Sequence, residues 1–201
     1  MNDIFDRITA PDNLFAAWRE FRRGKRRKPD VQAFERRLED HLFRLRDDLG
    51  DGRYRHGPYQ RFRIGDPKPR TIHKATVRDR LVHQAVVSVL GPILERSYIF
   101  DSYSCQPGKG PHAAVRRLES FRRKASRSNT RPCWTLKFDI AKFFDSVDHE
   151  ILLGLLAARI SCARTLRLLA EIVGSYSVST ALGGGAPLRN PNDRVASPSG
   201  A

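Results

Sequence analysis

The stretch Phe138–His149 places acidic and aromatic residues side by side in an otherwise strongly basic chain. Before it, apolar and polar residues alternate from Cys133 to Phe138, which predicts a β-strand with two different faces. Asp139 would then end this strand and face outward. Asp145 and Ser146 are suited to cap a following helix, whose apolar residues have helical spacing: Ile151, Leu152, Leu155 and Leu156. The predicted order is strand, aromatic turn, helix.

A carboxylate in this position is suited to metal-dependent phosphate chemistry. Two-metal sites for phosphate chemistry hold divalent ions about 3.5–4 Å apart, one at the attacking oxygen and one at the leaving oxygen. Mg²⁺ prefers oxygen ligands in octahedral geometry and keeps several waters, so one or two aspartates with a backbone carbonyl are enough protein ligands. Asp139 is therefore a candidate metal ligand.

The charge balance favours a nucleic-acid partner. The chain has 37 lysines and arginines against 22 aspartates and glutamates, a net charge of +15, so its surface should attract phosphate backbones. Its three cysteines lie far apart, without metal-ligand spacing or a disulfide framework. No apolar run is long enough to span a bilayer. These features predict a cytoplasmic protein with no membrane partner.

Four blocks of the sequence occur in the order in which reverse transcriptases have them. They are 62–72, 77–85, 101–110 and 138–149. On these blocks the chain resembles the bacterial retroelement reverse transcriptases, which include group II intron, retron and diversity-generating types, from about Gly52 to about Leu188. The residues at His83–Ala85 and Gly108–His112 are most similar to the diversity-generating type.

The resemblance implies an α+β fold, an incomplete right-hand polymerase. A helical N-terminal region would cover 1–49, fingers 50–132 and a partial palm with the first catalytic motif 133–188. The tail 189–201 departs from the family pattern, and its Pro, Ser, Asn and Gly content predicts disorder.

The resemblance also implies roles for single residues at the metal site. Asp139 would be the catalytic carboxylate that bridges two Mg²⁺ ions, and Ile140 would add its backbone carbonyl. Phe144 would pack beneath the sugar and favour deoxynucleotides, with ordinary core packing as the alternative. The family's second ligand set, an aromatic-x-Asp-Asp hairpin, does not occur in these 201 residues. We therefore expect a truncated chain that is inactive alone.

Cations outside the metal site have implied roles as well. Arg70 and Lys68 would bind the incoming triphosphate, or else be solvated cations on a ribbon. Lys109 would contact template phosphate. The basic link Gly24–Pro29 is either a solvated turn or a contact for RNA. Asp79 and Arg80 would form a structural pair.

Two functions of different classes follow. The first is an RNA-directed DNA polymerase that uses an RNA template, a DNA primer or RNA–DNA hybrid and deoxynucleoside triphosphates, with a possible accessory protein. The second is a non-catalytic nucleic-acid-binding remnant or accessory subunit. Two further alternatives are another palm-type nucleotidyltransferase, which would share the metal chemistry, and an unrelated basic protein, which would share the charge. Neither accounts for the sequence blocks 62–72, 77–85 and 101–110 in the predicted fingers.

Periodicity predicts the remaining elements. Two helices should lie within 1–49, a two-stranded ribbon within 53–73, and a buried helix over 77–95. A basic helix should follow over 111–123, a loop over 122–131, two helices over 152–156 and 166–173, and a strand over 176–182.

Overall fold

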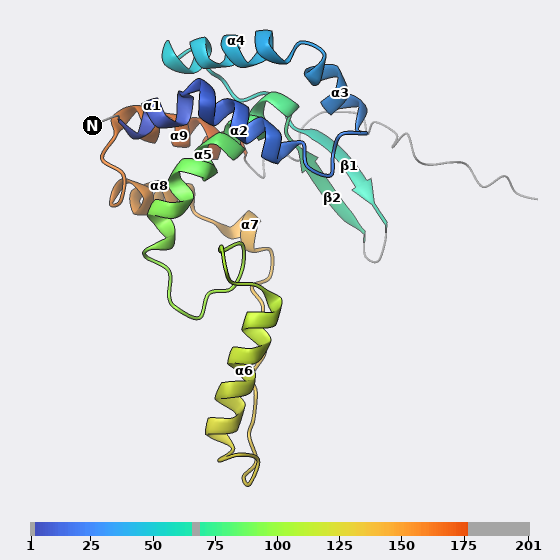
Figure 1. Ribbon diagram of the computed structural model, residues 1–201, viewed down its shortest axis with the longest axis vertical. Helices are drawn as coiled ribbons and strands as arrows, with labels where there is room; N and C mark the ends of the chain where they lie inside the picture. The colour runs from blue at the N-terminus through green and yellow to red at the C-terminus, as the bar shows by residue number, and fades with distance from the viewer. Residues whose placement is uncertain (1–2, 66–68, 177–201) are drawn as a thin grey trace, which may run out of the picture. The chain divides into compact units, whose positions relative to one another are not determined.

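The computed structural model describes residues 3–65 and 69–176, and these form two compact units. The first unit contains the described residues up to 89 and from 148 onward, and the second contains residues 90–147. In chain order the described elements are α1 (Ile4–Thr9), α2 (Pro11–Phe21), α3 (Pro29–Glu35), α4 (Leu38–Gly50), β1 (Gln60–Ile64), β2 (Arg70–Lys74), α5 (Val77–Glu95), α6 (Pro111–Ala125), α7 (Phe143–Ser146), α8 (His149–Ala157) and α9 (Ala163–Gly174) (Figure 1). Helices with a small sheet agree with the α+β class.

The first unit is built on helices that pack through their apolar stripes. α1 contacts α2, α4 and α9, and α4 also contacts α2 and α3. Asn13 links α2 to α5, because its side-chain amide donates to the Ala85 carbonyl over 3.1 Å and accepts from the Ser88 hydroxyl over 2.8 Å. The most deeply buried side chains of this core include Ile8, Leu14, Trp18, Leu42, Leu45, Leu81, Val82 and Ile160.

The described residues 3–50 form four helices, where the sequence pattern predicted two helices within 1–49. Pro11 and Pro29 each begin a helix, and a proline is tolerated there because the first amides of a helix have no acceptor within it. The residues before them, Ala10 and Lys28, have extended ψ angles of 135° and 126°, as the proline ring requires. Prolines thus account for two of the divisions.

The predicted ribbon is confirmed. β1 and β2 pair antiparallel, with Gln60 opposite Lys74, Phe62 opposite Ile72 and Ile64 opposite Arg70. Lys68 and the other residues of 66–68 lie outside the described residues, as do the tail 189–201 and all but the first residue of the predicted strand 176–182.

The predicted helix over 77–95 is confirmed as α5. Its apolar positions are buried at helical spacing, at Leu81, Val82, Ala85, Val86, Val89 and Leu90. Pro92 lies in the last turn, where it removes one hydrogen bond near the helix end. No described helix has both the length and the apolar character needed to span a membrane.

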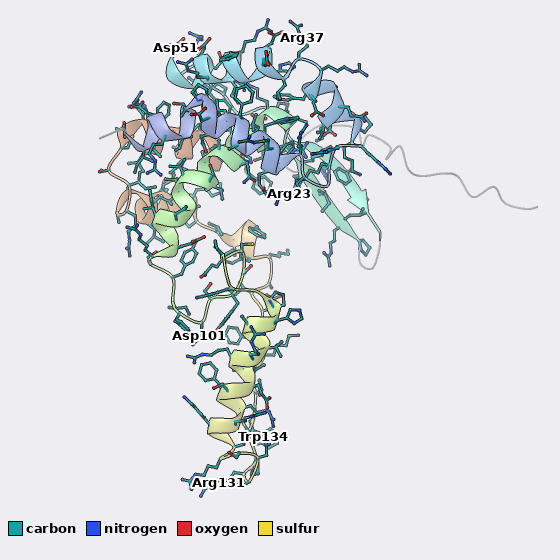
Figure 2. The ribbon with its side chains drawn as sticks, in the orientation of Figure 1. Arg23, Arg37, Asp51, Asp101, Arg131 and Trp134 are labelled. Atoms are coloured by element: carbon teal, nitrogen blue, oxygen red, sulfur yellow. The ribbon has the colours of Figure 1, made fainter. Side chains whose placement is uncertain are left out.

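The second unit contains α6, α7 and the segments that connect them. α6 confirms the predicted basic helix, but its apolar residues Val115, Leu118 and Phe121 are 65%, 54% and 43% exposed. The prediction of a strand over 133–138 is wrong: residues 132–140 have no regular secondary structure. Trp134 and Leu136 are 94% and 84% exposed, and Figure 2 labels Trp134 in this segment.

A missing partner explains that difference. A strand is stabilised by the hydrogen bonds and cross-strand contacts of its neighbour, and β1 and β2 are the strands in the described part of the chain. They pair with each other. The alternation from Cys133 to Phe138 therefore has no described sheet to join.

The two C-terminal helices were placed correctly, but the cap of the first was not. The Asp148 carboxylate accepts from the backbone N–H groups of Glu150 and Ile151 over 2.9 and 3.0 Å, so Asp148 is the N-cap of α8. Ser146 instead ends α7 and donates its hydroxyl to the Phe143 carbonyl. The prediction that Asp145 and Ser146 cap this helix is wrong, because the helix begins at His149 and its N-cap is Asp148.

Candidate functional site

Asp139 lies in the second unit, in an exposed segment just before the turn that leads into α7. Its carboxylate accepts a hydrogen bond from the Ile140 N–H over 3.0 Å, which leaves most of its lone pairs open to solvent. The turn then passes through Lys142, a non-glycine residue in the left-handed region with φ of 51°. Lys142 is the N-cap of α7. Asp139 is thus exposed to solvent just before the turn that leads into α7.

Two aromatic residues follow the carboxylate. The rings of Phe143 and Phe144 are 5.4 Å apart and nearly perpendicular, a favourable edge-to-face arrangement. Phe144 is 82% exposed, so its ring does not fill a core among the described residues. The core-packing alternative for Phe144 finds no support in this part of the chain.

The ligand set at Asp139 fits only part of a magnesium site. A carboxylate and the neighbouring Ile140 carbonyl are the oxygen donors that Mg²⁺ prefers. Within residues 3–65 and 69–176, however, no group of three or more histidine, cysteine, aspartate or glutamate side chains is placed to hold a metal ion. A complete two-metal site needs carboxylates beyond those described.

Lys109 has its ammonium group engaged within its own loop. Nζ donates to the Phe100 carbonyl over 2.6 Å and lies 4.9 Å and 5.5 Å from the ring centroids of Phe100 and Tyr103. Asp101 next to it is bound by Arg117, with an N–O distance of 2.7 Å, and by the Tyr103 hydroxyl. Any contact of Lys109 with a template phosphate therefore competes with these contacts.

Arg70 belongs to the first unit, at the start of β2. It is exposed, and no acidic partner is found for it among the described residues. Of the six residues singled out from the sequence, Asp139, Ile140, Phe144 and Lys109 share the second unit, Arg70 lies in the first, and Lys68 is not described.

The ribbon that bears Arg70 is held at its base by the buried carboxylate of Asp79. Asp79 is 1% exposed and accepts three hydrogen bonds: from the Tyr54 hydroxyl over 2.9 Å, the Gly57 N–H over 3.2 Å and the Thr76 hydroxyl over 2.5 Å. Gly57 precedes β1 and Thr76 follows β2. One side chain thus joins both ends of the ribbon to α5.

The expected pair between Asp79 and Arg80 does not form. Arg80 binds Asp30 of α3 over 2.8 Å, and the nearest cation to Asp79 is Arg78 at 3.9 Å. Asp79 is nevertheless structural, as predicted, because its neutral donors replace the solvent that it lost. Burial, together with the charge of Asp79, raises the pKa of Tyr54, so its hydroxyl stays protonated and donates.

Imidazole and phenol rings pack beside this carboxylate. His56 stacks between Tyr59 and His83, with centroid distances of 4.9 Å and 5.2 Å. Burial, and secondarily the neighbouring His56, lowers the pKa of His83, so the neutral ring is favoured. Glu171 of α9 accepts from the His56 backbone N–H over 2.9 Å, which ties α9 to the same cluster. Sequence patterns missed this cluster because its members have no common period.

Comparison with known proteins finds relatives that include an intron-encoded protein and an intron maturase. Protein YkfC of Escherichia coli (strain K12) is 30% identical over 164 residues, 81% of this chain and 42% of that protein. The group II intron-encoded protein LtrA of Lactococcus lactis subsp. cremoris is 27% identical over 134 residues, 65% of this chain and 21% of that protein. Nuclear intron maturase 1 of Arabidopsis thaliana is 27% identical over 92 residues, 46% of this chain and 12% of that protein. No family model matches.

The chain therefore spans less than half the length of each of these relatives. It is related to intron-encoded and intron maturase proteins, in agreement with the retroelement relationship inferred from its sequence blocks.

Proposed function

We propose that this chain provides the fingers and the first part of the palm of a retroelement RNA-directed DNA polymerase. The observation that carries the proposal is the exposed Asp139, just before the turn that leads to the aromatic pair of α7. The relationship to group II intron-encoded and intron maturase proteins supports it. RNA as template, a DNA primer or RNA–DNA hybrid and deoxynucleoside triphosphates are the proposed partners.

In this proposal the chain's own residues bind and orient the reactants. Asp139 and the Ile140 carbonyl would hold Mg²⁺, which supplies activation of the primer hydroxyl and neutralisation of the leaving diphosphate when bound. Arg70, with Lys68, would bind the triphosphate, since a guanidinium can donate two parallel hydrogen bonds to phosphate oxygens. Phe144 would contact the sugar and disfavour a 2′-hydroxyl. Lys109 would contact the template.

The reaction needs more carboxylates than Asp139 supplies. A lost electrostatic contact in the transition state typically costs about 3–4 kcal/mol, or a 10²–10³-fold slower rate. We therefore expect incorporation to depend on a second polypeptide segment that carries the remaining ligands, and this chain alone to be inactive or nearly so.

The second candidate function is nucleic-acid binding without catalysis. It is favoured by the net charge of +15 together with the lack of a three-residue metal-binding group among the described residues. Binding of this kind would depend on salt but not on Asp139.

Primer extension on an RNA template with Mg²⁺ separates the two functions. The purified chain, and the complex that co-purifies with it from cells, are compared with Asp139→Ala and with Asp47→Ala, an exposed control on α4. The polymerase proposal expects incorporation by the complex that Asp139→Ala abolishes and Asp47→Ala preserves. Incorporation that survives Asp139→Ala would overturn the role of Asp139. No incorporation by either preparation, with salt-sensitive RNA binding unchanged in Asp139→Ala, would establish the second function.

A further inference from the structure

The turn between α2 and α3 is the most basic short segment of the first unit. Seven of the ten residues 19–28 are lysine or arginine, and Glu20 is the one acid among them. From sequence alone this run fits a solvated linker as well as a contact for RNA. The structure distinguishes these two alternatives, because it shows how the backbone and each cation are held.

The backbone of this turn is fixed by its own hydrogen bonds. The N–H of Lys25 donates to the Arg22 carbonyl over 2.9 Å, and the N–H of Lys28 donates to the Lys25 carbonyl over 3.0 Å. Gly24 has a φ of 70°, a conformation that costs glycine little and side-chain-bearing residues more. Trp18 and Phe21, at the end of α2, are 1% and 5% exposed. The cations therefore lie on a turn of defined conformation, which follows directly from the buried end of α2.

Three of the seven cations already have partners. Arg22 forms an ion pair with Glu35, and Arg23, labelled in Figure 2, lies 3.2 Å from Glu20. Lys25 donates to the Phe21 carbonyl over 2.8 Å. The other four are exposed and pair with no acid in the described residues: Arg19, Arg26, Arg27 and Lys28. The turn thus has four unneutralised positive charges.

The arginines surround a hollow. Its volume is about 330 Å³, and it is lined by Arg19, Arg22, Arg23, Gly24 and Arg26. The Nε atom of Arg22 is buried and has no hydrogen-bond partner among the described residues. Arg22 thus keeps donor capacity beyond its ion pair with Glu35, and the arginines that line the hollow together would attract an anion.

We propose that this hollow binds a phosphate group of a nucleic-acid backbone. Phosphate matches the planar guanidinium fork and can accept from several arginines at once. The unpaired Arg27 and Lys28 extend the positive surface along the chain beyond the hollow, which suits a polymer with phosphates at regular intervals better than an isolated ion. The inference rests on the nucleic-acid partner of the proposed function and is independent of catalysis at Asp139.

The test is the salt dependence of nucleic-acid binding, measured by fluorescence anisotropy with single-stranded RNA, duplex RNA and duplex DNA. The variant Arg19→Gln/Arg26→Gln removes two cations from the hollow. The matched control, Arg44→Gln/Arg46→Gln, removes two exposed arginines of α4 that have no acidic partner in the described part of the chain and do not line the hollow. Both variants change the net charge equally.

The hollow variant should reduce the magnitude of the slope of log K against log salt by about 0.7–0.9, which is the contribution of one lost phosphate contact. The Kd should rise about tenfold more than in the control. Arg19→Lys/Arg26→Lys keeps the charge and should recover most of the slope. Circular dichroism confirms that each variant is folded. Similar losses for RNA and DNA support recognition of the phosphate backbone itself.

Equal losses in the hollow and control variants would overturn the proposal, because they would show that only the overall field attracts nucleic acid. Unchanged binding in the hollow variant would overturn it as well. Asp139→Ala should leave the salt dependence of nucleic-acid binding unaltered. A failure of primer extension would therefore not affect this inference, and a failure of the hollow variant would not affect the assignment of Asp139.

Discussion

Removing the Asp79 carboxylate should destabilise the first unit by about 3 kcal/mol. Asp79→Ala takes away the acceptor of three hydrogen bonds, from Tyr54, Gly57 and Thr76. Tyr54 is 4% exposed, so its hydroxyl cannot readily find water in the variant. The Thr76 hydroxyl is only half-buried and can be rehydrated. The penalty therefore comes mainly from the Tyr54 hydroxyl and the Gly57 N–H.

The magnitude follows from two unsatisfied donors. Each costs about 1–3 kcal/mol, and the variant regains part of this because a buried charge is no longer desolvated. A loss of about 3 kcal/mol is a large share of the 5–15 kcal/mol typical of a small domain. The ends of the ribbon at Gly57 and Thr76 should lose hydrogen-exchange protection first, since the carboxylate is what joins them to α5.

Tryptophan fluorescence can follow this unit alone. The chain has two tryptophans, Trp18 in the core of the first unit at 1% exposure and Trp134 in the second at 94%. A Trp134→Phe background leaves Trp18 as the reporter, and urea titration then gives the free energy of unfolding. Asp79→Asn keeps one acceptor oxygen, so its free energy of unfolding should fall by about half as much as that of Asp79→Ala.

Asp47→Ala, on the exposed side of α4, is the control and should stay within about 0.5 kcal/mol of the parent. A loss below about 1 kcal/mol for Asp79→Ala would refute the reasoning, because it would mean that the Tyr54 hydroxyl and the Gly57 N–H find other acceptors at little cost.

Other predictions concern acid sensitivity, capping and exposure. The His83 pKa is lowered in the folded chain, so its stabilising contribution is present above pH 6.5 and is lost as the pH falls below that value. His83→Gln should therefore make the urea midpoint less dependent on pH between pH 7.5 and 5.5. An unchanged dependence of the midpoint on pH would contradict this. Asp148→Ala should cost about 1 kcal/mol, seen as faster hydrogen exchange in the first turn of α8, whereas equal exchange would rule out the cap. Trp134→Ala should change stability by less than about 0.5 kcal/mol and Trp18→Ala by about 3–5 kcal/mol, and similar urea midpoints for the two would show that the exposures are misassigned.

Elements governed by local rules were predictable from the sequence. The apolar stripe of α5 recurs every three or four residues, and helical geometry alone places those residues on one buried face. The alternating, proline-containing segment before it gave the ribbon of β1 and β2. In both cases the partners lie within the element or adjacent to it in sequence. Short-range pattern is then sufficient.

The partners of buried polar groups were not predictable. Asp79 binds Tyr54, 25 residues earlier, and Arg80 binds Asp30, 50 residues earlier. A charged pair at adjacent positions suggests a contact, but neighbours on a helix project about 100° apart and seldom face each other. Which distant donor satisfies a buried carboxylate depends on how helices and loops pack.

The strand predicted before Asp139 shows why the candidate site itself was the hardest part to predict. Alternation indicates that the two faces of a segment differ, and in Cys133–Phe138 they do; it does not say whether another strand is available to pair. In the described residues none is, and Trp134 at 94% exposure has no partner surface. A chain that left this face uncovered would be prone to association. If a second polypeptide segment supplies the remaining carboxylates, pairing with this face would protect Trp134 from quenching by acrylamide at the same time as it places new ligands beside Asp139. Incorporation of nucleotides without any change in Trp134 quenching would show that the metal site can be completed without pairing at this face.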